Sequence, residues 1–261
     1  MKIAVCVKQV PLGNNEGMDK ETGNVLRTGK SIINSYDLVA LEFAMRVKEK
    51  VGASVDAFTM GPSKASEVLI TCFGYGVDEG YLISDKAFAG ADVLATSYTL
   101  ARAIQSVGHY DLILCGRQTT DGDTGHVSGA VSQWMEYPYF NGVLDILSVT
   151  AESVNILQHL DTEMMEWNIS YPCVLAIEKG KIIPRIPTLK AKLASKKKKI
   201  SIISKSDIKE ENNSYFGSKG SATKVRKIYT PDQERPCEEL IYDAETALVS
   251  ICQLLKEKRR M

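Results

Sequence analysis

The sequence contains few of the residues that build most catalytic and metal centres. Its 261 residues include three histidines, scattered along the chain, and six cysteines with no Cys-x-x-Cys pair. Structural zinc and iron–sulfur sites usually take their ligands from clustered cysteines and histidines. No nucleophile, base and acid form a recognisable catalytic set. These absences argue against a metalloprotein and against a hydrolase that uses a triad.

The sequence also lacks a surplus of one charge and a long apolar run. It has 32 Lys and Arg against 32 Asp and Glu, which argues against general binding to nucleic acid or to a membrane surface. No apolar run approaches the ~18 residues of a membrane span, and the apolar stretch at the start is too short for a signal peptide. We therefore expect a globular, cytoplasmic protein whose cysteines are buried, reduced thiols.

What the sequence does contain is a repeated alternation of strand and helix patterns. Strands are predicted at 2–10, 54–60, 79–84 and 111–115, and helices at 36–50, 63–73, 92–107 and from about 125. This order predicts a parallel sheet with helices on both faces. A small hairpin is predicted within 11–31. Beyond residue 141, VLDILSV, SVNILQHL, TEMMEWNIS and CVLAIEK are predicted as consecutive strands that add an antiparallel part to the sheet, and ISIIS as a last short strand.

The C-terminal part differs in composition from the rest. Residues 205–236 are rich in Ser, Lys, Glu, Asn and Gly and poor in large apolar residues, which predicts an extended arm. Residues 238–257 have the pattern of an amphipathic helix whose apolar face has no core of its own in such an arm. The sequence thus predicts an α/β domain over 1–204, and an arm with a helix over 205–261 that packs on a partner subunit.

The most informative segment is LILCGRQTTDGDTGHVSG, in which a buried strand is followed by a polar loop and a helix. Ligands of such sheets lie at the carboxyl ends of the strands. The start of a helix offers unpaired N–H groups to a phosphate, and Arg117 can hold a pyrophosphate. This loop contains neither Gly-Lys-Ser/Thr nor G-x-G-x-x-G. Two interpretations stay open: the loop binds a nucleotide, or Asp121 and Asp123 cap the helix and the glycines form the turn.

Five segments, in order, resemble the electron transfer flavoprotein beta family over roughly residues 1–203. They are VCVKQVP, Asn34-Ser35-Tyr36-Asp37 with the helix after it, Met60-Gly61-Pro62, GRQTTDGDTGHV and RIPTLKAKLASKKKKI. The resemblance implies a flavodoxin-like or adenine-nucleotide-hydrolase-like fold. It also implies a heterodimer with a larger alpha subunit that carries an electron-transferring FAD.

The resemblance further implies a nucleotide site in this chain and a docking residue. Its cofactor contacts would be Cys6, Asn34, Ser35, Tyr36, Asp37, Met60, Gly116, Arg117, Gln118, Thr119, Thr120, Asp121, Gly122, Asp123, Thr124, Gly125, His126 and Val127. Leu189 would anchor the segment that docks a flavin dehydrogenase of the acyl-CoA or lactate type. Ser35, where the family usually has Pro, and Lys190 to Leu193, where it has Pro-Asn-Ile-Met, depart from the pattern, and the second departure leaves the identity of the dehydrogenase open.

The loop residues favour one branch of that family. Members that hold AMP tend to have Asp-Asp-Asp-x-Asn where this chain has Asp121-Gly122-Asp123-Thr124-Gly125. The latter resembles members that hold a second FAD and exchange electrons between NADH, ferredoxin and the dehydrogenase by flavin-based bifurcation. FAD is therefore the expected cofactor, with NAD(H) as substrate of an oxidoreductase complex. The alternatives are a carrier subunit with structural AMP and a regulatory or ATP-hydrolysing nucleotide-binding protein of the same fold.

Overall fold

A computed structural model describes residues 1–12, 31–180, 182–209, 213–225 and 243–258. The chain divides into two compact units, Met1–Arg226 and Lys227–Met261. Residues 13–30 of the predicted hairpin lie outside the described residues. The two ends of the predicted hairpin, β2 (Gln9–Pro11) and β3 (Ser31–Ile33), pair antiparallel as a small separate sheet.

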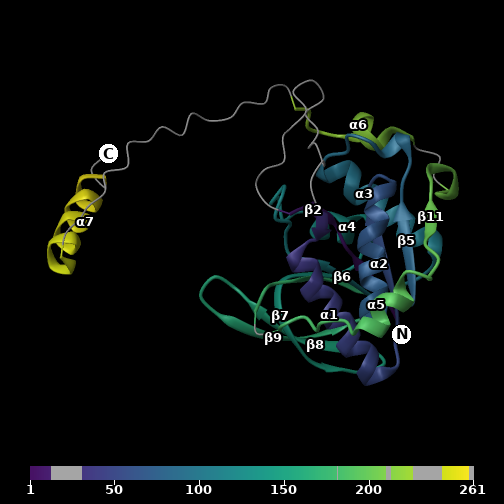
Figure 1. The fold of residues 1–261 in the computed structure, drawn as a ribbon, viewed down its shortest axis with the longest axis horizontal. Coiled ribbons are helices and arrows are strands. Elements are labelled where there is room, and N and C mark those ends of the chain that lie inside the picture. The colour runs from purple at the N-terminus through teal and green to yellow at the C-terminus, as the bar shows by residue number, and fades with distance from the viewer. Residues whose placement is uncertain (13–30, 181, 210–212, 226–242, 259–261) are drawn as a thin grey trace. The chain divides into compact units, whose positions relative to one another are not determined.

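The first unit is built on one nine-stranded sheet with the strand order β11-β5-β4-β1-β6-β10-β7-β8-β9 (Figure 1). In that order the strands span Ser201–Ile203, Glu79–Ile83, Ser54–Met60, Lys2–Cys6, Leu112–Gly116, Cys173–Ile177, Tyr139–Val149, Ser153–His159 and Met164–Ser170. Every pairing from β11 to β7 is parallel. On the other side of β7, β8 is antiparallel to both β7 and β9. The predicted α/β fold with a mostly parallel sheet is confirmed.

Helices cover both faces of the parallel part and divide the core into two clusters. The helices α1 (Ser35–Val51) and α2 (Ser66–Tyr75) pack on one face, against alternate strand residues such as Ile3 and Leu114. The helices α3 (Val93–Val107) and α4 (Val127–Met135) pack on the other face, against Ala4 and Ile113. Two short 3-10 turns, η1 (Ser63–Ala65) and η2 (Lys86–Phe88), precede α2 and α3. The side chains of a strand point alternately to the two faces, so each central strand is apolar throughout.

The strand β10 corrects one sequence-based expectation. We expected the segment from 173 onward to belong to an antiparallel addition, but β10 lies between β6 and β7 and is parallel to both. All five of its residues are buried. A short, continuous apolar run is typical of a strand covered on both faces, and CVLAI has that composition. The antiparallel addition is therefore the hairpin β8–β9 on the outer side of β7.

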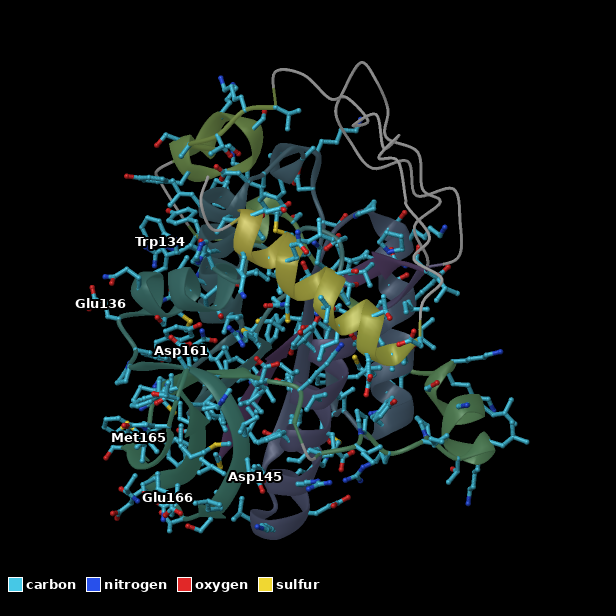
Figure 2. The ribbon with its side chains drawn as sticks, turned by 90° about the vertical axis from the view of Figure 1, so that its left-hand side faces the viewer. Trp134, Glu136, Asp145, Asp161, Met165 and Glu166 are labelled. Carbon is cyan, nitrogen blue, oxygen red and sulfur yellow. The ribbon has the colours of Figure 1, made fainter. Side chains whose placement is uncertain are left out.

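The hairpin β8–β9 forms the edge of the sheet and leaves apolar side chains uncovered. Figure 2 shows Asp161, Met165 and Glu166 on this part of the unit, below Trp134 and Glu136. The side chains of Met164 and Trp167 are exposed. Within the described part of the chain, no helix is both long and apolar enough to cross a membrane.

Residues 205–225 belong to the first unit, although the sequence places them in the extended arm. They form η3 (Lys205–Asp207), η4 (Asn213–Tyr215) and α6 (Gly217–Gly220). The Phe216 ring is buried, with its centroid 5.4 Å from that of Phe88 and 5.3 Å from that of Tyr98. The compact unit thus extends to Arg226 rather than to residue 204.

The second unit contains the helix α7 (Ala244–Lys258). The predicted amphipathic helix is thus present over its described residues, and residues 238–242 of the prediction lie outside them. Leu248, Ile251 and Leu255 are all exposed on it. Cys252 is exposed as well, contrary to the expectation that the thiols are buried, and all five cysteines that the structure describes are free.

Candidate functional site

The predicted site residues gather where the strand order reverses. From β1 the chain proceeds outward through β4 and β5, and then returns to the opposite side of β1 with β6. Cys6 and Cys115, near the carboxyl ends of β1 and β6, are direct partners in the parallel register. The crevice outside such a reversal is where open α/β sheets bind their ligands. The loop 117–126 and the start of α1 both border this point.

The centre of the site is a carboxyl group packed against a glycine. Asp37, in the first turn of α1, is buried, and its Oδ2 accepts a hydrogen bond of 2.7 Å from the Lys8 backbone N–H. Its Oδ1 accepts one of 3.0 Å from the Asn34 side-chain amide. A Cβ atom on Gly116 would lie 2.3 Å from Asp37 Oδ1 and 2.7 Å from Tyr36 Cβ. Only glycine therefore allows β6 to approach α1 this closely.

Burial dominates the electrostatics of Asp37. Desolvation raises the pKa of this carboxyl from 3.8 to about 7, against the lowering effect of its hydrogen bonds from Lys8, Asn34 and Gly116. Near neutral pH the group therefore exchanges a proton, unlike an ordinary surface aspartate.

Asn34 joins α1 to the loop and has one unused acceptor. Its side-chain amide also donates to the Gln118 carbonyl at 2.8 Å, and its backbone N–H donates to the Lys8 carbonyl at 2.9 Å. The Oδ1 atom of this fully buried side chain has no hydrogen-bond partner among the described residues. A buried polar atom without a partner is rare and unfavourable, so Oδ1 is a free acceptor at the position where a ligand is expected.

The loop 117–126 is held by charged residues that lie just beyond β1 and β10, the two strands that flank β6. Lys8 Nζ lies 2.7 Å from Asp121 Oδ1. Burial would raise the pKa of the Asp121 carboxyl, but the hydrogen bond and charge of Lys8 leave it below its usual value. At the other end of the loop, Arg117 forms an ion pair with Glu178, just beyond β10. These two pairs fix both arms of the loop at the crevice.

The turn of the loop leaves the start of α4 open. Asp123 and Gly125 both have left-handed backbone conformations, with φ of 50° and 64°. The N-cap residue of α4 is His126, and its side chain makes no capping hydrogen bond. Asp121 instead accepts from the Gly122 N–H at 2.7 Å. The capping interpretation is therefore wrong for Asp121, and the first N–H groups of α4 stay available for an anion.

The remaining predicted residues lie at varying distances from this centre. Gln118 Nε2 donates to the Tyr36 hydroxyl at 3.2 Å, and Lys179 Nζ lies 4.2 Å from the centre of the Tyr36 ring. Cys6 is partly exposed at the end of β1, and Met60 ends β4, the next strand in the sheet. Thr120 and Thr124 are exposed on the loop, whereas Ser35 begins α1.

Leu189 belongs to a different place. It begins α5 (Leu189–Ser195), which packs on α2, and its side chain is 74% exposed. The structure thus separates the expected docking residue from the crevice.

Sequence reasoning missed three residues of the site. Lys8, Glu178 and Lys179 hold Asp121, Arg117 and Tyr36, respectively. Lys8 lies two residues after β1 and Glu178 directly follows β10, so both lie at the carboxyl ends of the two strands that flank β6. That position is the signal that points to a ligand site in such a sheet. Among the described residues, no group of three His, Cys, Asp or Glu side chains is suited to a metal ion.

The comparisons with known proteins agree with the fold. A model of the electron transfer flavoprotein domain matches residues 22–208. The chain is 35% identical over 260 residues to an electron transfer flavoprotein subunit beta from Thermoanaerobacterium thermosaccharolyticum, which covers 99% of both chains.

Two further relatives carry other names. Subunit CarD of the caffeyl-CoA reductase-Etf complex from Acetobacterium woodii is 38% identical over 234 residues, 88% of both chains. Protein FixA from Azotobacter vinelandii is 32% identical over 248 residues, 92% of this chain and 88% of the relative. The domain match and this near full-length similarity establish the relationship. The chain belongs to the electron transfer flavoprotein family, among its beta subunits.

Proposed function

We propose that this chain binds FAD at the crevice between β1 and β6, as the beta subunit of a heterodimeric electron transfer flavoprotein in the cytoplasm. The heterodimer passes electrons between NAD(H), ferredoxin and a flavin dehydrogenase of the acyl-CoA or lactate type, by flavin-based bifurcation or its reverse. Bound FAD supplies the one- and two-electron redox chemistry. The protein supplies binding, orientation and a suitable electrostatic environment.

The observation that carries the proposal is the open loop before α4. Its uncapped N–H groups and the Arg117 guanidinium form a site for a pyrophosphate. Asn34 Oδ1 is a buried acceptor without a partner, ready for a donor on the nucleotide. A Cβ atom on Gly122 would meet nothing closer than 3.9 Å, so this turn leaves space on the side where AMP-type members have an aspartate. The residues present therefore fit a dinucleotide.

The partners are proposed from separate surfaces. The exposed apolar residues of α7 suit burial against the alpha subunit, because an exposed helix stripe of this kind is typical of interfaces. Leu189 on α5 suits docking of the dehydrogenase. The relative CarD is named as part of a reductase complex, which supports a direct partnership with a flavin dehydrogenase.

Two other functions compete with this one. A carrier subunit with structural AMP would use the same crevice and the same start of α4. A regulatory or ATP-hydrolysing protein of this fold would need no partner subunit. The cofactor content of the complex separates all three.

The test is to co-express the chain with its alpha subunit, purify the pair, denature it and quantify released FAD and AMP. We expect two FAD per heterodimer for the natural sequence. The substitution Gly122→Asp should lower this to one FAD, because it brings a carboxylate to the phosphate site. The alpha-subunit FAD serves as an internal control, since it should stay at one. One FAD and one AMP from the natural complex would refute the FAD assignment and leave the carrier with AMP.

A further inference from the structure

The segment 182–188, which leads from β10 to α5, has little regular structure of its own. No backbone–backbone hydrogen bond joins residues 182–187 to another described residue. A stretch of this kind adopts one conformation only if side chains hold it, because the backbone alone gives it no restraint. The contacts that restrain it are therefore of interest.

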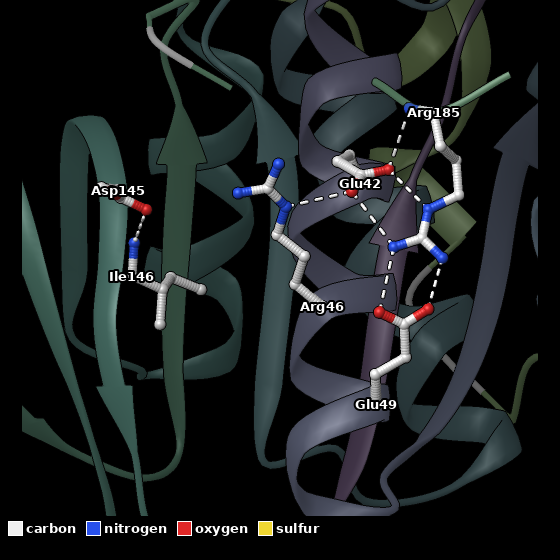
Figure 3. A network of polar contacts seen from close by, with 6 residues as sticks. All are labelled: Glu42, Arg46, Glu49, Asp145, Ile146 and Arg185. Carbon is white, nitrogen blue, oxygen red and sulfur yellow. Dashed lines mark hydrogen bonds and ion pairs between the residues drawn. The ribbon is translucent and has the colours of Figure 1, made fainter. Parts of the chain in front are cut away.

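Arg185 provides the strongest restraint. Its guanidinium lies between two carboxylates of α1, with Nε 2.8 Å from Glu42 Oε2 and Nη2 3.1 Å from Glu42 Oε1 (Figure 3). Nη1 and Nη2 also donate to Glu49, the latter at 3.2 Å. The backbone N–H of Arg185 adds a fifth bond, of 3.1 Å, to Glu42. This planar, multidentate arrangement is one that a lysine cannot reproduce.

Burial of the Glu42 carboxylate makes its pairing with Arg185 necessary. The Glu42 side chain is 5% exposed, and that of Arg185 33% exposed. Burial would raise the pKa of the Glu42 carboxyl, but the Arg185 guanidinium and backbone N–H keep it below its usual value. A buried carboxylate of this kind needs its partner, since leaving it unpaired is strongly unfavourable.

The segment has one further anchor on each side of Arg185. The Ile182 side chain is 6% exposed and packs into the core. Pro187 lies beside α2, so close that a Cβ atom on Gly74 would be 3.6 Å from it. Between and beyond these anchors, four apolar side chains point outward. We call them the apolar ridge, and they are Ile183, Ile186, Leu189 and Leu193, with exposed fractions of 81%, 86%, 74% and 58%.

We propose that Arg185 is a positioning residue for partner docking, which fixes the apolar ridge in one arrangement before the partner arrives. The partner class is a protein surface with an apolar hollow rimmed by carboxylates, because Lys190, Lys192, Lys196 and Lys197 flank the ridge with positive charge. Ordering a segment before binding removes an entropy loss from the binding step. The inference rests on the proposed function, since the ridge contains Leu189.

The experiment compares two arginines that share Glu42. Arg185→Met removes the link between the segment and α1. Arg46→Met is the matched control, because Arg46 bonds to the same carboxylate at 3.0 Å from within α1 and is not part of the segment. Arg185→Lys keeps the charge and tests whether the multidentate geometry matters. All variants are made in the co-purified heterodimer.

Two measurements decide the outcome. Hydrogen exchange should become faster in Arg185→Met at residue 185, whose N–H bonds to Glu42, and over α5, and it should stay unchanged in Arg46→Met. With a purified acyl-CoA or lactate-type flavin dehydrogenase that reduces the natural heterodimer, the KM for the dehydrogenase should rise about tenfold in Arg185→Met, with kcat and cofactor content unchanged. The exchange rates and the KM of Arg185→Lys should lie between those of the natural heterodimer and those of Arg185→Met.

Several results would overturn the inference. If the hydrogen-exchange rates and the KM for the dehydrogenase in Arg185→Met equal those of the natural heterodimer, the ridge needs no support from Arg185. An equal loss of kcat and cofactor would show a general structural role instead. If neither dehydrogenase class reduced the natural heterodimer, the proposed function would fail, and the exchange comparison alone would still decide whether Arg185 orders the ridge.

Discussion

The buried Asp37 carboxyl should make the stability of the chain depend on pH in an unusual direction. Its pKa is about 7 in the folded chain and about 3.8 when unfolded. Between about pH 3.8 and about pH 7, the Asp37 carboxyl is protonated in the folded state and ionised in the unfolded state. The unfolded state therefore binds fewer protons, and the free energy of unfolding falls as pH rises. Above about pH 7 both states are ionised and this contribution stays constant.

The size of the effect follows from the width of that window. At 1.36 kcal/mol for each pH unit, the difference between the two pKa values corresponds to about 4 kcal/mol. About 2 kcal/mol of this falls between pH 5 and pH 7, because the slope weakens as the folded-state carboxyl approaches its own pKa. The carboxyls of Glu42, Glu49 and Asp78 have lowered pKa values. Their contribution has the opposite sign and is lost only as pH falls toward the acid range, so it does not cancel the slope above pH 5.

The assay is urea unfolding of the full-length chain at half-unit steps from pH 5 to pH 8, for the natural sequence and for Asp37→Asn. Asparagine keeps the shape of the side chain and does not titrate. We expect the natural chain to lose stability up to about pH 7 and then level off, and the variant to be nearly flat. A natural chain whose stability is flat or rises over this range would refute the reasoning, as would an equal slope in Asp37→Asn.

Two further substitutions test the packing of the first unit by urea unfolding. Gly116→Ala should destabilise the chain by about 3 kcal/mol, because its Cβ would overlap Asp37 and overpacking of this kind costs about 1–3 kcal/mol. Gly122→Ala, in the loop that follows β6, should change stability by less than about 0.5 kcal/mol. Equal effects of the two substitutions would contradict the close approach of Gly116 to Asp37. Phe216→Ala should cost about 3 kcal/mol, since it removes a buried aromatic ring. Val225→Ala is the control, because Val225 is exposed and its truncation should change the free energy of unfolding only slightly. An equally small change for Phe216→Ala would mean that residues 205–225 do not stabilise the unit.

The central sheet was predictable because local pattern and tertiary environment agree there. The strand at 54–60 matches the observed Ser54–Met60, and the alternation of strands and helices correctly indicated parallel pairing. The position of β10 was missed because consecutive strands usually pair with their neighbours in sequence. Here the hairpin β8–β9 separates β7 from β10 along the chain, yet β10 pairs with β7 in space.

The predicted end of the α/β domain, at residue 204, differs from the end of the first unit, at Arg226, for another reason. Composition describes the average polarity of a segment, and residues 205–225 are polar on average. A few side chains hold the segment on α3: the Phe216 ring is buried, the Tyr215 ring centroid lies 5.0 Å from that of Tyr98, and the Thr223 N–H donates to Asp92. Burying an aromatic side chain contributes several kcal/mol. Composition averaged over the segment does not detect such individual anchors.

The site was predictable in position but not in its internal contacts. The loop after β6 could be read as a ligand site from the strand, the glycines and the helix start. The ion pair between Lys8 and Asp121, 113 residues apart, depends on how β1 and β6 lie side by side. Contacts of this kind appear only when the sheet order is known.

The polar residues buried along α1 explain why the crevice and the docking segment are related. Asp37 and Glu42 are both buried on α1, whose other buried residues are all apolar. Each buried carboxylate is unfavourable unless neighbouring groups compensate it. Asp37 accepts hydrogen bonds from the N–H groups of Lys8, just beyond β1, and of Gly116 in β6, whereas Glu42 accepts them from Arg185. Because both lie on one helix, separated by about 7.5 Å of helix axis at 1.5 Å per residue, α1 ties the segment that carries the apolar ridge to the same rigid element that borders the nucleotide crevice.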